Sequence, residues 1–371
     1  MGMDGTIRTR FLKPETPYFL SHSVGLMPRG AAATLNKQVL DPWRMQGQSW
    51  DEWLAILDRF RTALGSFLNA DPALICPQAN VSSALTKILF SLPQPDRRNV
   101  ILLSEQDFPT IGFVALQAER LGWQLRYVPR EADLTDEEVW LDAMGDDVGI
   151  VLVTHAYSNS AMLAPVVSIT QFAAARGIVS VVDIAQSAGT IPIDLALWQA
   201  DFVIGTSVKY LCGGPGAAFL WVSPQIVETC TPLDVGWFSH EDSFEFDLKQ
   251  FRYAPDARRF WGGTPSVLPY AMAAHAVETL TAIGIDAIHR QNQQRLGRLI
   301  DGLDPALIRS EPREGRRGSH LLYAPHDMEA AAARLEEAGI RHDRRDGALR
   351  LSVHLYITDQ DREAARDALA G

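Results

Sequence analysis

The sequence has few cysteines and no long apolar run. Three of its 371 residues are cysteines, Cys76, Cys212 and Cys230, and no two of them form a C-x-x-C pair. This pattern offers neither a disulfide framework nor a zinc knuckle, and it favours a reducing compartment, so we expect a cytoplasmic protein without a metal centre. No apolar run approaches the roughly 18 residues of a membrane span, and residues 1–13 lack an apolar stretch of signal-peptide length. We therefore expect neither membrane insertion nor export.

The chain also lacks an excess of positive charge. It has 34 lysines and arginines against 45 aspartates and glutamates, which gives a formal net charge of -11. Binding of nucleic acid requires clustered lysine and arginine, and the short basic patch at residues 313–317 is interrupted by a glutamate. We expect no nucleic-acid partner. With 47% hydrophobic and 21% charged residues, the chain is typical of a globular protein long enough for two domains.

Lysine is scarce, and one lysine stands in an informative place. Lys209 follows the apolar run at residues 202–204, whereas basic charge elsewhere comes mostly from arginine. A lysine desolvated at the end of a buried strand can have a lowered pKa and form a Schiff base, which arginine cannot do because it does not lose its proton. Taken alone, Lys209 is explained at least as well as a solvated loop residue. Its neighbours favour the chemical interpretation.

Short apolar runs alternate with helical patterns through the first two thirds of the chain. The runs lie at residues 100–103, 124–128, 149–153, 179–182, 202–204 and 218–222. Continuous apolar strands separated by amphipathic stretches such as residues 169–176 predict an α/β fold with a mostly parallel, doubly wound sheet. In such sheets ligands bind beyond the carboxyl ends of the strands. The residues that follow each run are therefore the candidates for a site.

The composition changes near residue 255 and suggests a second domain. An alanine-rich helical pattern covers residues 266–283, and a strand-like pattern covers residues 348–355. We predict a large domain at residues 30–255 and a smaller α/β domain built from residues 1–29 and 256–371. The sequence shows no internal repeat.

The residues around Lys209 match what pyridoxal phosphate requires. That cofactor needs a lysine for its aldehyde, a carboxylate at its pyridine nitrogen, an aromatic face over its ring and donors at its phosphate. Asp183 ends the run at residues 179–182, Gln186 follows three residues later, and Phe108 stands before Pro109 on a stiff loop. Each has a structural alternative: a helix cap for Asp183, a polar residue of a first helical turn for Gln186, and a core residue for Phe108.

A helix start supplies the donors that a phosphate needs. Asn80, Val81, Ser82 and Ser83 precede a helical pattern at residues 84–90, so free backbone N–H groups, hydroxyls and a positive helix end occur together. A plain N-cap explains these residues about as well. The glycine-rich segment at residues 213–216 does not lead from a strand into a helix, and we interpret it as a tight turn before the strand at residues 218–222.

Two longer stretches carry a family resemblance. Residues 183–194 and 209–216 resemble the class V aminotransferase superfamily of fold-type I pyridoxal-phosphate enzymes, and within it the kynureninases. The resemblance covers most of the chain. Its other supporting pieces are Phe108-Pro109-Thr110, Ser49-Trp50 with Trp53, Thr154-His155, and Gly236-Trp237-Phe238-Ser239-His240.

The resemblance implies a role for each candidate residue. Lys209 would carry the cofactor, Asp183 would pair with the pyridine nitrogen, Phe108 would stack on the ring, and Gln186 would face its phenolic oxygen. At the phosphate the resemblance implies Val81, Ser82, Thr206 and Trp237. Thr264, in Gly263-Thr264-Pro265, lies in a segment that such enzymes lend across a dimer interface, so a homodimer with shared active sites is implied. Arg350 would bind the substrate α-carboxylate, since arginine is suited to bidentate binding; from the residues alone, a surface strand position explains it equally well.

The sequence departs from kynureninases at three positions of the cofactor shell. Ile111, Val208 and Gln186 stand where those enzymes usually carry aspartate, tyrosine and histidine. The cysteine desulfurases of the same superfamily need a nucleophilic cysteine late in the chain, and none follows Cys230. We therefore do not expect that activity.

The resemblance implies an enzyme that acts on an amino acid through an external aldimine and a Cα carbanion, with Lys209 as the general base. Our first expectation is kynureninase-like hydrolytic cleavage of the bond between Cβ and Cγ. The alternative is a class V aminotransferase that passes the amino group to a keto acid. A third hypothesis is a non-catalytic homologue that only binds the cofactor. Such a homologue is expected to have lost Lys209 or Asp183, and both are present.

Overall fold

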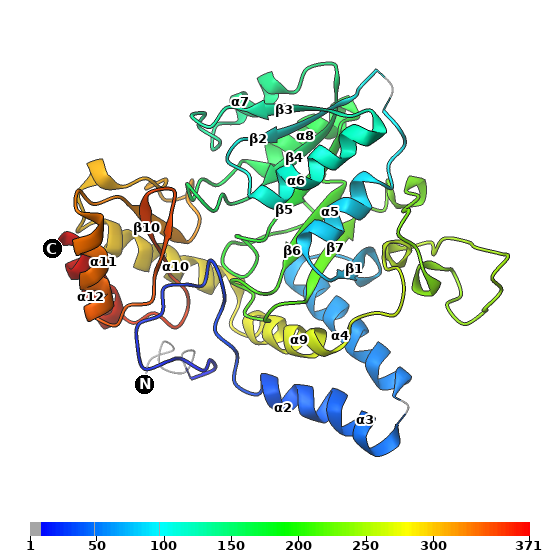
Figure 1. Cartoon of the computed structure of the whole chain (residues 1–371), viewed down its shortest axis with the longest axis horizontal. Coiled ribbons are helices and arrows are strands. Elements are labelled where there is room, and N and C mark those ends of the chain that lie inside the picture. The colour runs from blue at the N-terminus through cyan, green and yellow to red at the C-terminus, as the bar shows by residue number, and fades with distance from the viewer. Residues whose placement is uncertain (1–8, 48, 96) are drawn as a thin grey trace.

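The larger of two sheets contains seven strands. In a computed structural model, which describes residues 9–47, 49–95 and 97–371, their spatial order is β1-β7-β6-β5-β4-β2-β3 (Figure 1). The strands are β1 (Ile75–Gln78), β2 (Val100–Ser104), β3 (Gln124–Val128), β4 (Val148–Thr154), β5 (Val179–Asp183), β6 (Phe202–Thr206) and β7 (Ala218–Val222). Strands β3, β2, β4, β5 and β6 pair in parallel, whereas β7 runs antiparallel to both β6 and β1. The predicted mostly parallel sheet is confirmed.

Helices cover both faces of this sheet. Along β6, Phe202 and Ile204 pack into one hydrophobic cluster and Val203 packs into the other, because successive side chains of a strand point to opposite faces. The first cluster includes residues of α5 (Val81–Leu89) and α6 (Pro109–Ala118). The second includes residues of α4 (Trp50–Leu68), α7 (Glu137–Ala143), α8 (Val166–Arg176) and α9 (Leu268–Thr281). The doubly wound arrangement is therefore confirmed.

The sequence patterns located six of the seven strands and missed β1. All six apolar runs are strands, and each agrees with the predicted bounds to within two residues. Strand β1 has the sequence Ile75-Cys76-Pro77-Gln78, and its proline argues against a strand in a sequence pattern. It lies at the edge of the sheet, where a residue without an N–H group is tolerated.

A second, three-stranded antiparallel sheet lies beside the first. Its order is β8-β10-β9, with β8 (His320–Tyr323), β9 (Asp343–Arg345) and β10 (Ala348–Ser352). Helices α10 (Ile285–Ile300), α11 (Met328–Glu337) and α12 (Asp359–Ala370) surround it (Figure 1). The N-terminal segment joins this part of the molecule, because Ser352 donates its N–H to the carbonyl of Phe19 at 2.8 Å. The domain boundaries that we expected stay a prediction.

The remaining elements are short. Helices α2 (Ala31–Leu35) and α3 (Asp41–Gln46) flank a π-helical turn at Asn36–Leu40, and the 3-10 turns are Pro72–Leu74, Glu119–Leu121, Val227–Thr229, Trp237–Ser239, Ala257–Phe260 and Pro305–Leu307. Within the described ranges no single helix has the length and apolar character to cross a membrane. Helices α9 and α10 meet that test only as a pair, and they are bent by 79° relative to each other.

Helix α9 is attached to the sheet through a buried tyrosine. The hydroxyl of Tyr270 lies 2.7 Å from the carbonyl oxygen of Gln78 on β1 and 2.9 Å from that of Ala218 on β7. Its ring packs edge-on against Phe60 of α4 at 4.9 Å between centroids. The hydroxyl thus connects one helix to two strands that border the site described below.

Replacing Tyr270 by phenylalanine is expected to lower the free energy of unfolding by about 1–3 kcal/mol, because two buried carbonyls lose a shared donor. Urea unfolding measures the change. The control is Tyr127→Phe, since the Tyr127 side chain is 41% exposed and its change is expected to stay within about 0.5 kcal/mol. Equal unfolding midpoints for the two variants would contradict the assigned role of Tyr270.

Candidate active site

Several strands end at the same edge of the large sheet and enclose a cavity there. Strand β1 is parallel to β6, because both pair antiparallel with β7, so the loops after β1, β2, β4, β5 and β6 meet. The cavity has a volume of about 220 Å³. It is lined by Asn80, Val81, Ser82, Phe108, Thr110, Thr154, Ala156, Ser158, Asp183, Ala185, Gln186, Thr206 and Lys209. Seven of the ten residues predicted from the sequence are in this lining; Arg350, Trp237 and Thr264 are not.

Lys209 reaches this cavity from the turn after β6. Its Nζ atom lies 5.5 Å from the centroid of the Phe108 ring. Burial lowers the pKa of Lys209, the charge of Asp183 acts in the opposite direction, and the charges of Arg350 and Arg345 lower it further. An amine with a lowered pKa is more often neutral, which is the state that attacks an aldehyde.

The backbone of the Lys209 turn is held by the N-terminal segment. Gly25 donates its N–H to the carbonyl of Val208 at 2.8 Å. A Cβ atom on Gly25 would lie 2.1 Å from the carbonyl oxygen of Lys209, so no other residue fits without moving the turn. The position of the lysine therefore depends on a segment far away in the sequence.

Asp183 lies at the carboxyl end of β5 and is buried. Its Oδ1 atom accepts the N–H of Ala185 at 2.8 Å. Burial raises the pKa of Asp183, while the charge of Lys209 and the hydrogen bond from Ala185 lower it. A cation next to this buried carboxyl group, such as a protonated pyridine nitrogen, would stabilise its ionised form.

Phe108 and Gln186 present an aromatic face and an unused acceptor. Phe108 precedes Pro109, the first residue of α6, and its side chain is 41% exposed, so it is not a core residue. Gln186 donates from Nε2 to the carbonyl of His22 at 3.1 Å, whereas its buried Oε1 atom has no hydrogen-bond partner among the described residues. A buried acceptor of this kind at a cavity is suited to a ligand hydroxyl.

The N-terminus of α5 forms another wall of the cavity. The side chain of Asn80 accepts the N–H of Ser83 at 2.8 Å, and the Ser83 hydroxyl completes a capping box. The capping role is confirmed, and it coexists with an anion site, because the first turn of the helix lines the cavity through Val81 and Ser82. Lysine, carboxylate, aromatic ring, free acceptor and helix N-terminus together fit pyridoxal phosphate.

Asp107 is part of the site, although no sequence motif identifies it as a site residue. Its Oδ1 atom lies 2.6 Å from the hydroxyl of Thr154, and its Oδ2 atom accepts the N–H of Ser104 at 2.8 Å. Burial raises the pKa of Asp107 to about 7, and the charge of Asp183 adds to this. The group connects the loops after β2 and β4 and so positions Phe108. Its only sequence signal is its place in the loop between β2 and α6.

His155 lies behind the cavity wall rather than in it. Its Nδ1 atom is 3.0 Å from the hydroxyl of Ser187, and its ring packs edge-on against Trp198 at 5.0 Å. Burial lowers the pKa of His155 to about 3, so the imidazole is neutral near pH 7. We assign it a supporting role for the loop that carries Gln186.

Arg350 is buried on β10, so the alternative of a surface strand residue is wrong. Its Nε and Nη2 atoms bind the carboxylate of Asp343 at 2.9 and 2.6 Å, and its Nη1 atom donates to the carbonyl of Ser158 at 3.0 Å. Ser158 lines the cavity, so the guanidinium lies at its border. Its predicted contact with a substrate carboxylate stays a prediction.

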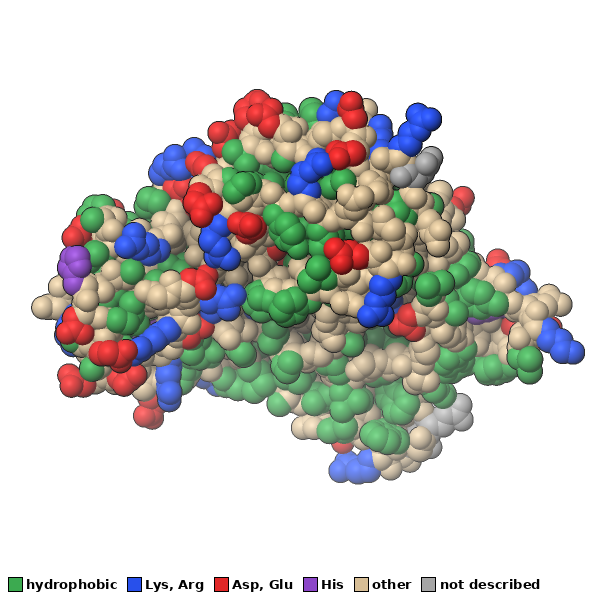
Figure 2. Space-filling view, turned by 45° about the horizontal axis from the view of Figure 1, so that its top comes forward, with side chains coloured by type: hydrophobic (Ala, Val, Ile, Leu, Met, Phe, Trp, Pro, Cys, Tyr) green, Lys and Arg blue, Asp and Glu red, His purple; other side chains and the backbone are tan. Residues whose placement is uncertain are grey.

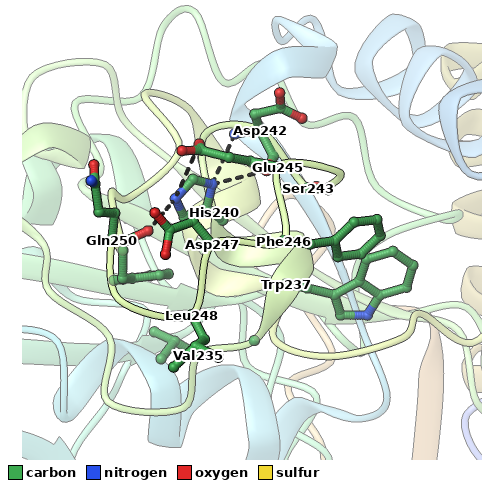
Figure 3. A pocket seen from close by; sticks show the side chains of 12 residues that line it. Val235, Trp237, His240, Asp242, Ser243, Glu245, Phe246, Asp247, Leu248 and Gln250 are labelled. Carbon is green, nitrogen blue, oxygen red and sulfur yellow. Dashed lines mark hydrogen bonds and ion pairs between the residues drawn. The ribbon is translucent and has the colours of Figure 1, made fainter.

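Trp237 and Thr264 lie together, away from the cavity lining. The indole Nε1 atom donates to the Thr264 hydroxyl at 3.3 Å. Residues 231–255, which we call the arm, project from the body at the right of Figure 1. Figure 3 shows Trp237 and Phe246 side by side there. Their rings are stacked, with centroids 6.0 Å apart. In this chain the arm does not bring Trp237 to Lys209, and its cofactor role stays a prediction.

Comparison with known proteins gives consistent results. The family described as Aminotransferase class-V matches residues 35–361. A kynureninase of Deinococcus radiodurans is 31% identical over 364 residues, which cover 93% of this chain and 87% of that protein. An uncharacterized aminotransferase of Bacillus subtilis, YcbU, is 25% identical over 326 residues, which cover 88% of this chain and 86% of that protein.

Solved structures share the fold. An apo cysteine desulfurase of Thermococcus onnurineus superposes with a TM-score of 0.88 at 20% identity, covering 100% of this chain and 98% of that one. A lysine-to-alanine mutant of the protein C-DES, with glycine linked covalently to its pyridoxal-phosphate cofactor, gives a TM-score of 0.87 at 20% identity, covering 96% of both chains. At this identity the likeness shows the fold alone, and it confirms the expected fold type.

The pKa of Asp107 predicts a pH dependence of stability. Because the pKa in the folded protein, about 7, lies above the ordinary 3.8, the stabilisation by neutral Asp107 is complete below about pH 4 and is lost as the pH rises through 7. Each pH unit between these values corresponds to about 1.4 kcal/mol, so the loss is at most about 4 kcal/mol.

Asp107→Asn is expected to remove this dependence. Asparagine imitates the neutral acid, because its amide can donate to the Thr154 hydroxyl and accept the N–H of Ser104. We expect the thermal unfolding temperature of the variant to fall less than that of the wild type between pH 5 and pH 8. Parallel curves for the two proteins would mean that Asp107 does not titrate in this range.

Proposed function

The chain belongs to the aminotransferase class-V family and is a pyridoxal-phosphate-dependent enzyme, and on this premise we propose that it is a kynureninase-like hydrolase of an amino acid. In this reaction water cleaves the bond between Cβ and Cγ of the substrate, and alanine is released. The observation that carries the proposal is the cavity shared by Lys209 and Asp183, together with 31% identity to a kynureninase over 93% of the chain.

The chemistry follows from the positions of this chain's own groups. When bound, pyridoxal phosphate supplies an aldehyde for the substrate amine and a ring that accepts electrons from Cα. Lys209, once its amine is free, takes the proton from Cα, and its lowered pKa suits that task near neutral pH. The negative charge of Asp183 would favour a proton on the pyridine nitrogen. Phe108 would pack on the ring, and the first turn of α5 would bind the phosphate.

Transamination is the second candidate, and a specific observation favours it. Ile111, at the position where kynureninases usually carry aspartate, is 3% exposed and packs in the hydrophobic cluster of α5 and α6. The cofactor shell therefore lacks that carboxylate, and YcbU, which is named as an aminotransferase, is also similar to this chain. In this reaction Lys209 would take the proton from Cα, the cofactor when bound would retain the amino group, and a keto acid would leave.

A cysteine desulfurase function is not supported by the thiols. Cys76, Cys212 and Cys230 are free and buried. Burial raises the pKa of Cys76 to about 12 and that of Cys230 to about 11. A nucleophilic thiol needs access and a low pKa, and these three have neither. Their free state is consistent with the reducing, cytoplasmic location that we propose.

The enzyme is expected to release alanine from L-kynurenine or 3-hydroxykynurenine. Amino-acid analysis of the product separates the candidates, because hydrolysis yields alanine in equal amount to an aromatic acid, whereas transamination consumes a keto acid. Lys209→Ala should lower turnover by at least about 10³-fold. The control is Lys37→Ala, since Lys37 is exposed and lies outside both the cavity lining and residues 231–255. Unchanged turnover in Lys209→Ala would overturn the catalytic assignment.

We also propose that the protein is a homodimer in which the arm contacts the second copy. The arm carries three strongly exposed apolar side chains: Leu233 at 72%, Phe246 at 74% and Leu248 at 93%. Figure 2 shows hydrophobic side chains on this projection at the right. Contiguous exposed apolar surface of this kind is typical of an interface.

The arm is anchored firmly enough to serve as an interface element. The buried Lys87 donates to the carbonyls of Phe260 and Trp261, each at 2.8 Å, and its Nζ atom lies 3.3 Å from the carboxylate of Asp234. An arm fixed at its base is able to bring Trp237 to the cavity of the second copy, and Thr264 lies beside it through the hydrogen bond from the indole. This arrangement accounts for their distance from Lys209 of their own chain.

Sedimentation tests the dimer. The wild type is expected to sediment as a dimer, and the double variant Phe246→Glu, Leu248→Glu as a folded monomer that retains less cofactor. Leu197→Glu is the control, because Leu197 is 66% exposed outside the arm. A monomeric wild type at all protein concentrations would refute the proposal.

A further inference from the structure

We propose that Arg345 binds the substrate carboxylate together with Arg350. Arg345 supplies a net positive charge, because the charge of Arg350 is already balanced by Asp343. This inference rests on the proposed function only in taking the cavity of Lys209 as the site of an amino acid. It assigns a binding role to a residue that neither motif nor cavity lining identified.

Strand β9 directs Arg345 toward the cavity. Successive residues of a strand point to opposite sides, so Asp343 and Arg345 share one side and Arg344 lies on the other. Arg344 binds the carboxylate of Glu329 on the exterior, with Nη2 and Oε2 2.8 Å apart. Arg345 instead lies against Phe108, with its Cζ atom 5.6 Å from the ring centroid. Phe108 lines the cavity and also faces Lys209.

The charge of Arg350 is already balanced. Asp343 binds it through two hydrogen bonds. Burial alone would raise the pKa of Asp343, but hydrogen bonds from Arg350 and His22 hold that pKa well below its usual range, so the carboxylate stays ionised. Burial lowers the pKa of His22 to about 4, so this imidazole adds no charge near pH 7. The group of Arg350, Asp343 and His22 is therefore neutral overall.

The charge of Arg345 is not balanced. Its Nε atom is buried and has no hydrogen-bond partner anywhere in residues 9–47, 49–95 and 97–371, and no ion pair involving it is found within these ranges. A partly buried guanidinium without an anion is unfavourable, and an incoming carboxylate removes that penalty. Arg350 then fixes the orientation of the carboxylate through hydrogen bonds, and Arg345 provides the net attraction.

This balance also defines a substrate class. One substrate carboxylate neutralises Arg345. A second one would find near Phe108 only the amine of Lys209, whose pKa is lowered by burial. The site is therefore suited to an α-amino acid with an uncharged side chain. Such a substrate is consistent with the proposed cleavage at Cγ.

Binding of L-alanine and L-alaninamide to the holoenzyme tests the inference. The two probes differ in the carboxylate alone, and the change in cofactor absorbance reports binding without turnover. The wild type should prefer alanine, and added salt should weaken that preference. Arg345→Gln should weaken alanine binding by about tenfold or more and change alaninamide binding by less than about twofold. Arg345→Lys, which keeps the charge, should retain part of the preference for alanine. If the glutamine variant does not fold, the preference of the lysine variant is compared with that of the wild type instead.

Arg344→Gln is the matched control, because it removes a neighbouring arginine from the outer side of the same strand. Its preference for alanine should equal that of the wild type. The inference is wrong if Arg345→Gln weakens both probes equally, if it changes neither, or if it loses the cofactor on dialysis, which would place Arg345 at the phosphate. A wild type that prefers alanine but releases none from kynurenine would reject the proposed reaction and leave the role of Arg345 standing.

Discussion

The burial of Lys209 and Asp183 beside each other is the constraint on which the rest of the site depends. Burial lowers the pKa of the amine and raises that of the carboxyl group, and each group opposes the effect on the other. Two opposite charges in a buried site are stable only if further groups form hydrogen bonds or ion pairs with them. The sheet achieves this because parallel strands end at one edge, where β5 supplies Asp183, the turn after β6 supplies Lys209, and the N-terminus of α5 faces both.

The cavity is closed by parts of the chain that are distant in sequence. The N-terminal segment binds the Lys209 turn through Gly25 and accepts the amide of Gln186 at the carbonyl of His22. The same segment binds β10 through the carbonyl of Phe19, and β10 carries Arg350. The small sheet, the N-terminal segment and the lysine turn therefore form one continuous hydrogen-bonded unit.

Sequence reasoning located the residues whose signals are local. The ends of strands are visible as the ends of apolar runs, so the sequence alone places Asp183, Lys209 and Phe108 at one edge of a sheet. Asp107 could not be identified, because its burial and its bond to Thr154 depend on how two strands far apart in sequence become neighbours. Arg350 was identified by resemblance, but its pairing with Asp343 and the unpaired state of Arg345 follow from a strand pairing that the sequence does not reveal. Strand β1 was missed because its proline is acceptable only at a sheet edge.

The most direct test of this account is the site of covalent attachment of the cofactor. The purified protein would be reduced with borohydride and digested, and the peptides would be analysed by mass spectrometry. The account predicts a single pyridoxyl modification on the peptide that contains Lys209, with Lys13, Lys37, Lys87 and Lys249 unmodified. Modification of a different lysine, or a protein that binds the cofactor without any reducible bond to Lys209, would contradict it.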